Sequence, residues 1–450
     1  MNKGKKRIFL LTTFIIMAAM AFSQQVGSNS PYGRYGYGVL SHPAIGSSES
    51  MGGISYGLRR SEHVNPGNPA SYSKLDSLTF VFDMGVSFHY AKFSDNINNQ
   101  EFYNGNLDYL AMQFPIYKKI VASMGLLPYS KVGYNFGQTR YLSDIVYQES
   151  YRASGGLNRL YGGVSYEISK NIAIGANLSF LFGNYTYSNV VNPLTSLNSR
   201  VAEKKNAFKV RALKYDFGTQ VTYPIDKRRS LTIGAVYSPQ VKTESTVYHT
   251  QMMYQTDPYY NPQHNPQQGL VQVLRNDTLA GEQFQLPHSF GLGASYTEGN
   301  LLVGIDATYQ LWKNLDYPAV IDGMSKDERF NNQYRVNAGM EYVIDPMSTS
   351  FWQRIRFRGG LSFGNSYTNM NVFDTKSNKT VGIGSFKEYG AYAGFGFPFK
   401  DVYAKQSMVN ISFSYTRQQP DKRNMIQQDM FKVSVGMNIN ELWFRKFRFN

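Results

Sequence analysis

The sequence predicts an all-β protein: a transmembrane antiparallel β-barrel of about fourteen strands with an N-terminal hatch or plug segment. Three observations lead to this fold class. Apolar residues alternate with small or polar ones over long runs from about residue 78 onward. Charged residues make up only 17% of the chain, yet its mean hydropathy is −0.38. Apolar residues are therefore interspersed with small and polar ones rather than concentrated in long runs. Aromatic residues, 15% of the chain, collect at the ends of the alternating runs.

The first 23 residues are interpreted as a secretory signal peptide. A basic start at residues 3–7 precedes an apolar run at residues 8–22, which is too short to span a membrane comfortably. The small residues Ala21 and Ser23 fit a cleavage site directly after Ser23. We therefore expect an exported protein, with an uncleaved anchor as the alternative. Because the chain contains no Cys, a lipid-anchored terminus, disulfides and a thiolate metal site are excluded.

Residues 24–77 are expected to form a hatch in the barrel lumen. They are rich in Gly, Ser, Asn and Pro and show no ladder of strands. Such a segment cannot face lipid, because its backbone groups would stay unpaired, so it either hangs in the periplasm or fills the lumen. A turn at its end would lead the chain from lumen to wall, because Pro fixes φ and Asn side chains bond their own backbone. The turn residues are Asn65, Pro66, Asn68, Pro69 and Ala70.

Residues 78–440 are expected to form the barrel wall. A soluble two-sheet sandwich would also show alternation, but these runs are about 10 to 15 residues long, against roughly 5 to 6 for an average strand. Aromatic girdles at the two membrane interfaces are expected of transmembrane barrels. The predicted strands begin near residues 78, 106, 120, 154, 172, 208, 231, 282, 301, 332, 355, 387, 408 and 429.

The connections between these strands alternate in length. Short turns are expected near residues 118, 170, 228 and 299, and the longest loop at about 248–281. Short turns lie on the periplasmic side of outer-membrane barrels, and an even strand count returns both termini to that side. The sequence therefore predicts a protein of the bacterial outer membrane, with residues 441–450 as a periplasmic tail.

Charge points to the expected partners. A net charge of +15 on an exported chain favours outer-membrane lipid and lipopolysaccharide as contacts over nucleic acid, which we do not expect as a partner. Charges also occur on the predicted inner faces. We interpret them as a salt-bridge network that braces the hatch, with a polar conduit or a closed lumen as alternatives, and expect Glu341 and Arg356 to meet. The network residues are Asp83, Asp306, Arg335, Glu341, Arg356, Arg358 and Glu388.

Motifs for catalysis were sought and none is convincing. The stretch Gly53-Ile54-Ser55-Tyr56-Gly57 matches G-x-S-x-G, but no helical period follows it, so the strand-to-helix elbow of a hydrolase is not expected. The six His residues show no metal-ligand spacing. We therefore predict no catalytic residues, no metal, no cofactor and no enzymatic activity.

Several short motifs, taken in order, resemble the FadL family of outer-membrane transporters (the OMPP1/FadL/TodX type). These motifs are Met51-Gly52-Gly53, Asn68-Pro69-Ala70, the Leu-Pro stretch at 286–293 and the stretch Gly125–Ser130, while residues 30–36 look like the Bacteroidetes-type version. The resemblance implies a lateral opening at a kink in the third strand. Pro128 and Tyr129 lie at that position here, where Pro removes a ladder hydrogen bond.

The resemblance also implies a function: passive transport of a small hydrophobic, fatty-acid-like molecule through a hatch-gated lumen. The charged residues on the predicted inner faces do not suit an apolar channel, so fatty-acid specificity stays open. The alternative is a structural or partner subunit of a larger outer-membrane complex for protein secretion or insertion. The long loop at 248–281 and the basic, aromatic tail at 443–450 would suit that role.

Overall fold

The computed structural model describes residues 30–95, 99–142, 145–194, 200–255, 271–317, 324–373, 380–400 and 406–442. The predicted signal peptide, its cleavage near Ser23 and most of the predicted C-terminal tail lie outside the described residues. Within the described part, no helix is both long enough and apolar enough to cross a membrane.

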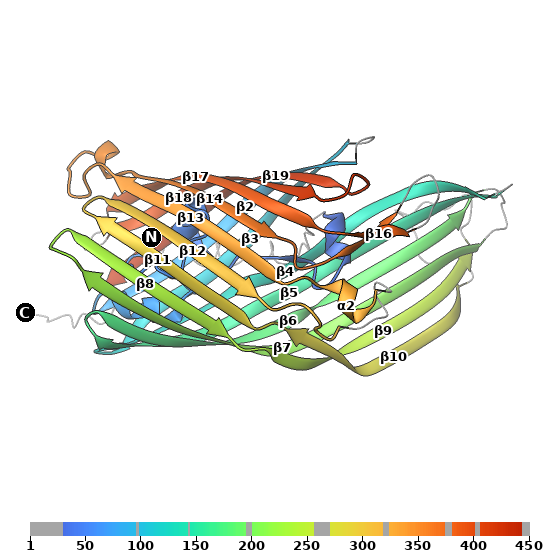
Figure 1. The fold of residues 1–450 in the computed structure, drawn as a ribbon, viewed down its shortest axis with the longest axis horizontal. Helices are drawn as coiled ribbons and strands as arrows, with labels where there is room; N and C mark the ends of the chain where they lie inside the picture. Colours follow the sequence, from blue (N-terminus) through green and yellow to red (C-terminus); the bar gives the residue numbers. More distant parts are fainter. Residues whose placement is uncertain are drawn as a thin grey trace, which may run out of the picture.

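The strands form one closed antiparallel barrel (Figure 1). Except at two interrupted strands, each wall strand pairs with the wall strands before and after it in the chain, and the last strand pairs with the first from Gln427↔Ser94 to Leu442↔Thr79, which closes the wall. The wall strands are β2 (Thr79–Ser94), β3 (Asn99–Tyr117), β4 (Ile120–Leu142), β5 (Ile145–Ser169), β6 (Ile172–Pro193), β7 (Arg200–Pro224), β8 (Arg229–Ser238), β9 (Val241–Gln255), β10 (Val271–Leu286), β11 (Ser289–Glu298), β12 (Leu301–Gln310), β13 (Gln333–Val343), β14 (Arg356–Asn365), β17 (Phe386–Lys400), β18 (Gln406–Pro420) and β19 (Gln427–Leu442).

Two wall strands are interrupted. Strands β8 and β9 both pair with β7, so they are two parts of one wall strand, and β11 and β10 pair with them in the same way. Pro239 and Pro287 lie at the two interruptions, where Pro cannot donate to a ladder. Counted this way the wall has fourteen strands, and the predicted fold class is confirmed.

Several strands are longer than predicted. β5 and β7 each have 25 residues, and β9 and β10 occupy most of the stretch predicted as a long loop at 248–281, so that prediction was wrong on the described residues. In Figure 1 these strands extend beyond the rest of the barrel at one end. Beyond the lipid-facing belt the inward residues of β7, such as Phe208 and Val210, stay buried, while the outward residues Lys209 and Arg211 are polar and exposed. The ladder therefore continues without the apolar outer face that the prediction used.

The lipid-facing belt is clear on β7. Leu213, Tyr215, Phe217, Val221 and Tyr223 point outward and are 40 to 67% exposed. The run from Leu213 to Tyr223 matches the roughly 9 to 11 residues that a transmembrane β-strand needs. The belt therefore ends at Leu213, on the side of the longer strand extensions.

The N-terminal segment lies inside the barrel. It contains the short elements η1 (Pro31–Arg34), β1 (Val39–Leu40), η2 (Gly46–Met51) and η3 (Pro69–Lys74). Its backbone lies so close to the wall that a Cβ at Gly234 would overlap the carbonyl oxygen of Tyr56, and one at Gly360 would overlap the amide of Gly52. Glycine on the inner faces therefore makes room for the segment.

An aromatic cluster packs around the first part of this segment. Tyr37 is fully buried among Phe284, Trp312, Phe330 and Tyr367. Aromatic pairs of this kind each contribute about 0.5 to 1.5 kcal/mol beyond their buried area. The remaining elements lie in the connections: α2 (Lys326–Arg329), η4 (Trp352–Arg354), β15 (Met370–Phe373) and β16 (Thr380–Gly384).

Candidate functional site: the lumen and the breaks in the wall

The turn residues at the end of the N-terminal segment bond both the segment and the wall. Asn68 caps η3 by accepting from the amide of Ala70 at 3.1 Å, and its Nδ2 donates to Tyr56 O and to Thr219 O of β7. Asn65 donates to the carbonyl of Ser55 at 2.7 Å. Pro66 accepts from Asn177, and Pro69 packs on Gly175 and Gly218. The last two turn residues, Pro69 and Ala70, thus begin a six-residue 3-10 helix that precedes β2, which the sequence did not suggest.

One group of charges is centred on Glu341 of β13. Arg60 of the N-terminal segment donates two hydrogen bonds to its carboxylate at 2.7 and 2.9 Å. Arg356 and Arg358 of β14 approach the same carboxylate at 3.0 and 2.6 Å. Arg356 also pairs with Glu62 of the segment at 2.8 Å. This group therefore ties the segment to the wall through two separate acids.

Two further groups make the same kind of connection. Arg335 pairs with Glu388 at 2.7 Å, and His42 of the segment lies 3.9 Å from that carboxylate. Lys432 of β19 pairs with Glu49 of η2 at 2.5 Å and with Asp108 of β3 at 2.8 Å. Neither Glu49 nor Asp108 was among the predicted network residues. The register places Asn104, not Asp108, in line with Lys432 through His89 of β2, so strand alternation gave no signal for this pair.

The remaining two predicted charges each approach the N-terminal segment separately from these groups. Asp306 accepts hydrogen bonds from the amides of Ser55 and Tyr56 at 2.5 and 2.8 Å. Asp83 is fully buried and accepts from the hydroxyl of Tyr109 at 3.0 Å. All seven predicted residues thus face the lumen side of the wall, but they form separate groups rather than one network.

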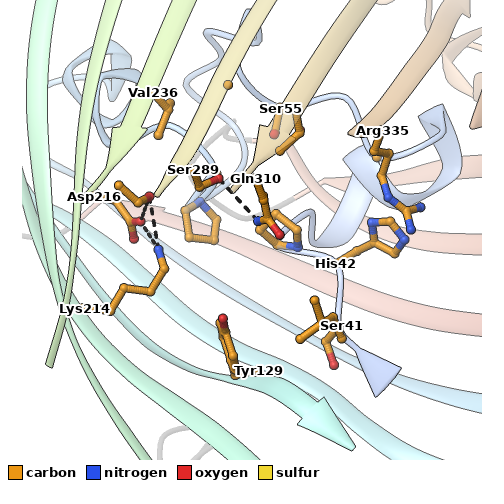
Figure 2. A pocket seen from close by; sticks show the side chains of 18 of the residues that line it. Ser41, His42, Ser55, Tyr129, Lys214, Asp216, Val236, Ser289, Gln310 and Arg335 are labelled. Atoms are coloured by element: carbon orange, nitrogen blue, oxygen red, sulfur yellow. Dashed lines mark hydrogen bonds and ion pairs between the residues drawn. The ribbon is translucent and has the colours of Figure 1, made fainter. Parts of the chain in front are cut away.

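Two cavities flank the N-terminal segment within the lumen. One, of about 140 Å³, is lined by His42, Lys214, Asp216 and Arg335 among others (Figure 2). The other, of about 220 Å³, lies beside Glu49, Asp108, Pro128 and Lys432. Ligand sites usually enclose about 300 to 1,000 Å³. Both cavities are therefore small, and charged side chains line both of them.

A fourth polar group borders the smaller cavity. Lys214 and Asp216 of β7 form an ion pair, Ser238 donates to Asp216 at 2.5 Å, and Arg159 lies 3.7 Å from the same carboxylate. In Figure 2 Lys214 and Asp216 point toward each other on one side of the cavity, opposite His42 and Arg335. Lys214 and Asp216 lie two residues apart on the same inner face of β7, so strand alternation alone places them together. Arg159 of β5 and Ser238 at the end of β8 meet Asp216 only in the folded wall.

The backbone ladder between β3 and β4 stops beside Pro128. Strand β4 is continuous, but Tyr129 is an unpaired bulge residue, because Pro128 pairs with Asn158 and Ser130 with Leu157. Among the described residues, the ladder between β3 and β4 ends at Leu110↔Leu126. Beyond that point β1 takes the place of β3: Leu40 pairs with Ser130, and Ser41 donates to Tyr129 O at 2.9 Å. We call this region, residues 99–109 of β3 and 127–142 of β4, the β3–β4 break.

A second gap in the backbone ladder lies on β7. This strand pairs with β8 through residues 217–224 and with β9 through residues 200–210, so residues 211–216 have no ladder partner on that side among the described residues. Instead, the hydroxyl of Thr243 donates to Arg211 O at 2.8 Å. We call residues 211–216 and the facing residues 238–244 the β7–β8 break.

The motif at residues 53–57 lies in irregular backbone between η2 and η3, and no helix follows it directly. Its Ser55 is buried, with its amide bonded to Asp306. Within the described part of the chain, no three His, Cys, Asp or Glu side chains gather as a metal site.

Comparison with known protein families identifies the family of this chain. A family model described as BamG matches residues 5–450. The chain belongs to the BamG family. No curated protein sequence matches it.

Solved structures show the fold of this BamG family member. The chain is similar to the Ralstonia pickettii toluene transporter TbuX (13% identity, TM-score 0.56, covering 88% of this chain and 98% of that one). It is also similar to the Pseudomonas putida toluene transporter TodX (14%, 0.54, 90% and 100%) and to a Pseudomonas aeruginosa FadL homologue (12%, 0.53, 89% and 98%). At these identities the likeness concerns the fold, and the predicted FadL-type barrel is confirmed at that level.

Proposed function

We propose that this protein allows passive passage of a small hydrophobic, fatty-acid-like molecule across the bacterial outer membrane. Residues 24–77 act as the hatch, and the β3–β4 break acts as the lateral exit. The observation that carries the proposal is the ending of the ladder at Leu110↔Leu126, next to a lumen cavity that Pro128 lines. The similar folds of the toluene transporters TbuX and TodX support it.

The hatch must move for passage to occur, because both cavities are smaller than a usual ligand site. The contacts of Arg60 with Glu341, His42 with Glu388 and Glu49 with Lys432 resist that movement. Breaking a buried ion pair by removing one partner costs about 3 to 5 kcal/mol, so the complete release of the hatch would be expensive. A local shift of residues 39–41 away from β4 breaks no ion pair among those described and opens the exit first.

An engineered disulfide tests this proposal. The native chain has no Cys, so the double substitution Leu40→Cys/Ser130→Cys creates one pair, at positions that face each other in the β1–β4 ladder. We expect uptake of radiolabelled toluene and of a radiolabelled long-chain fatty acid by intact cells to stop when this variant is oxidised and to return after reduction.

A matched control places the disulfide within the wall. Phe413 and Val433 face each other in the β18–β19 ladder and are exposed on the outer surface, so Phe413→Cys/Val433→Cys locks two wall strands and leaves the hatch free. Its uptake should not depend on oxidation. Equal uptake by the oxidised and reduced hatch variant would contradict passage along the β1–β4 contact.

A second candidate function is that of a subunit in a larger outer-membrane complex for secretion or insertion. The observation that favours it is the extension of the wall strands beyond the lipid belt, where Val271–Leu286 of β10 pairs with β9 alone among the described strands. A long unpaired edge is a template for another chain. Native mass spectrometry of the gently extracted protein separates the two functions: a stoichiometric protein partner supports the subunit, and a lone barrel carrying a hydrophobic molecule supports passage.

A further inference from the structure

The outer surface of the β7–β8 break carries a groove that the proposed function does not use. Apolar side chains of Phe180, Leu213 and Tyr215 line one part of it, and Arg211 and Lys242 line another. The groove exists because the interrupted strand leaves β7 at Pro239, so the wall surface is indented there. An acyl chain could lie on the apolar part while its headgroup contacts the two cations.

The groove lies at a defined height in the membrane. The apolar outward-facing positions of β7 end at Leu213, and the next outward position is Arg211, followed by Lys209. The short turns of the barrel lie at the opposite end of β7, beyond Pro224. Since short turns are periplasmic in such barrels, Arg211 and Lys242 lie at the headgroup level of the outer leaflet.

The charge of the groove is positive. The nearest described acid on β7, Asp216, faces the lumen, where Lys214 and Arg159 engage it. Among the side chains that the structure describes, no carboxylate lies within ion-pair distance of Arg211 or Lys242. Two unneutralised cations above an apolar surface complement a lipid that carries phosphate on its headgroup.

We infer that this groove binds a phosphorylated glycolipid of the outer leaflet, with a lipid phosphate between Arg211 and Lys242 and an acyl chain along Phe180, Leu213 and Tyr215. The site is separate from the hatch and from the β3–β4 break. It anchors lipid against the part of the wall where the backbone ladder is absent, and Pro239 lines both this groove and the lumen cavity behind it.

The test uses the full-length purified protein in detergent micelles and native mass spectrometry with three probes: diphosphorylated lipid A, dephosphorylated lipid A and inorganic phosphate. We expect the native chain to retain diphosphorylated lipid A in preference to the other two. Each cation near a membrane surface contributes a few-fold in affinity, so Arg211→Ala/Lys242→Ala should weaken this binding roughly thirtyfold.

A charge-matched control removes two cations at the other end of the barrel. Lys227→Ala/Arg228→Ala alters the short turn before β8 and should bind lipid like the native chain. Glu244→Gln, which removes the acidic residue two positions beyond Lys242 on β9, should bind at least as tightly. The heat-dependent shift in gel mobility that folded barrels show verifies that every variant is folded.

Two results would overturn the inference. Equal loss of lipid in the groove variant and in the turn variant would show a general charge effect without a site. Binding of inorganic phosphate as strong as that of diphosphorylated lipid A would show an anion site without lipid. Either result leaves the proposed passage untouched, because uptake through the β3–β4 break is measured separately.

Discussion

The β3–β4 break and the β7–β8 break are two solutions to the same local problem. At each, a Pro lies where the backbone ladder stops, Pro128 in one and Pro239 in the other. The first is covered from inside by the N-terminal segment, whose β1 pairs with β4. The second is covered by wall side chains, with Thr243 bonding Arg211 O and Ser238 bonding Asp216.

This difference indicates which of the two breaks can open without unfolding the wall. A break covered by a separate segment opens when that segment shifts, while the wall itself stays folded. A break held by buried ionic contacts between wall strands opens only if the wall is damaged. The following predictions test this contrast, from the largest effect to the smallest.

Removing the acid of the β7–β8 break should have the largest effect. In Asp216→Ala, Lys214 and Arg159 lose their carboxylate while staying mostly buried. We expect a loss of about 3 to 5 kcal/mol in the free energy of unfolding. Urea titration of the micelle-bound barrel measures it, and Asp226→Ala, which removes an exposed turn carboxylate, is the control. A loss no larger than that of the control would show that this break is not held by its ionic contacts.

Straining β1 should have the next largest effect. Gly38 has φ +78°, and a Cβ there would press on Val132 and the carbonyl of Lys131. Gly38→Ala therefore costs about 1 to 3 kcal/mol and loosens β1 from β4. We expect uptake of toluene to rise while the wall stays folded. Amide exchange that stays slow at residues 39–41 would contradict the idea that the segment covers this break.

Removing the hydroxyl that bridges the β7–β8 break should have a smaller effect. Thr243→Val deletes the bond to Arg211 O. A single hydrogen bond contributes about 0.5 to 1.5 kcal/mol, so we expect a loss in that range without any change in uptake. A rise in uptake would show that this break also serves as an exit.

The smallest effect on stability is expected at the outer surface. Arg211→Ala removes an exposed side chain with no described ionic partner, so the free energy of unfolding should change by less than about 0.5 kcal/mol. A larger loss in lipid-free micelles would mean that Arg211 supports the wall itself rather than a lipid.

Much of the wall could be predicted because each face of a strand contacts a different solvent. Lipid on one side and a wet lumen on the other impose alternation, so β6, β12 and β19 begin within two residues of the predicted positions 172, 301 and 429. Strand lengths were predicted poorly for β5 and β7, because beyond the lipid belt their outward residues become polar while their inward residues stay buried.

The lumen was predicted only in part. Inward charges such as Glu341 and Glu388 could be read from the alternation, but their partners in the N-terminal segment could not. Arg60 and Glu341 are 281 residues apart, and nothing in the local sequence pairs them. The same holds for Arg159 and Ser238, which meet Asp216 from other wall strands.

The amino-acid sequence by itself determined the barrel, its strand order and the faces of its strands, because each alternating residue responds only to the solvent on its own side. Tertiary structure alone decided where the ladder stops, what covers each break and which charges meet across the lumen. Those features depend on the register between strands and on how a long irregular segment packs within a closed wall, and both are contacts between residues far apart in the chain.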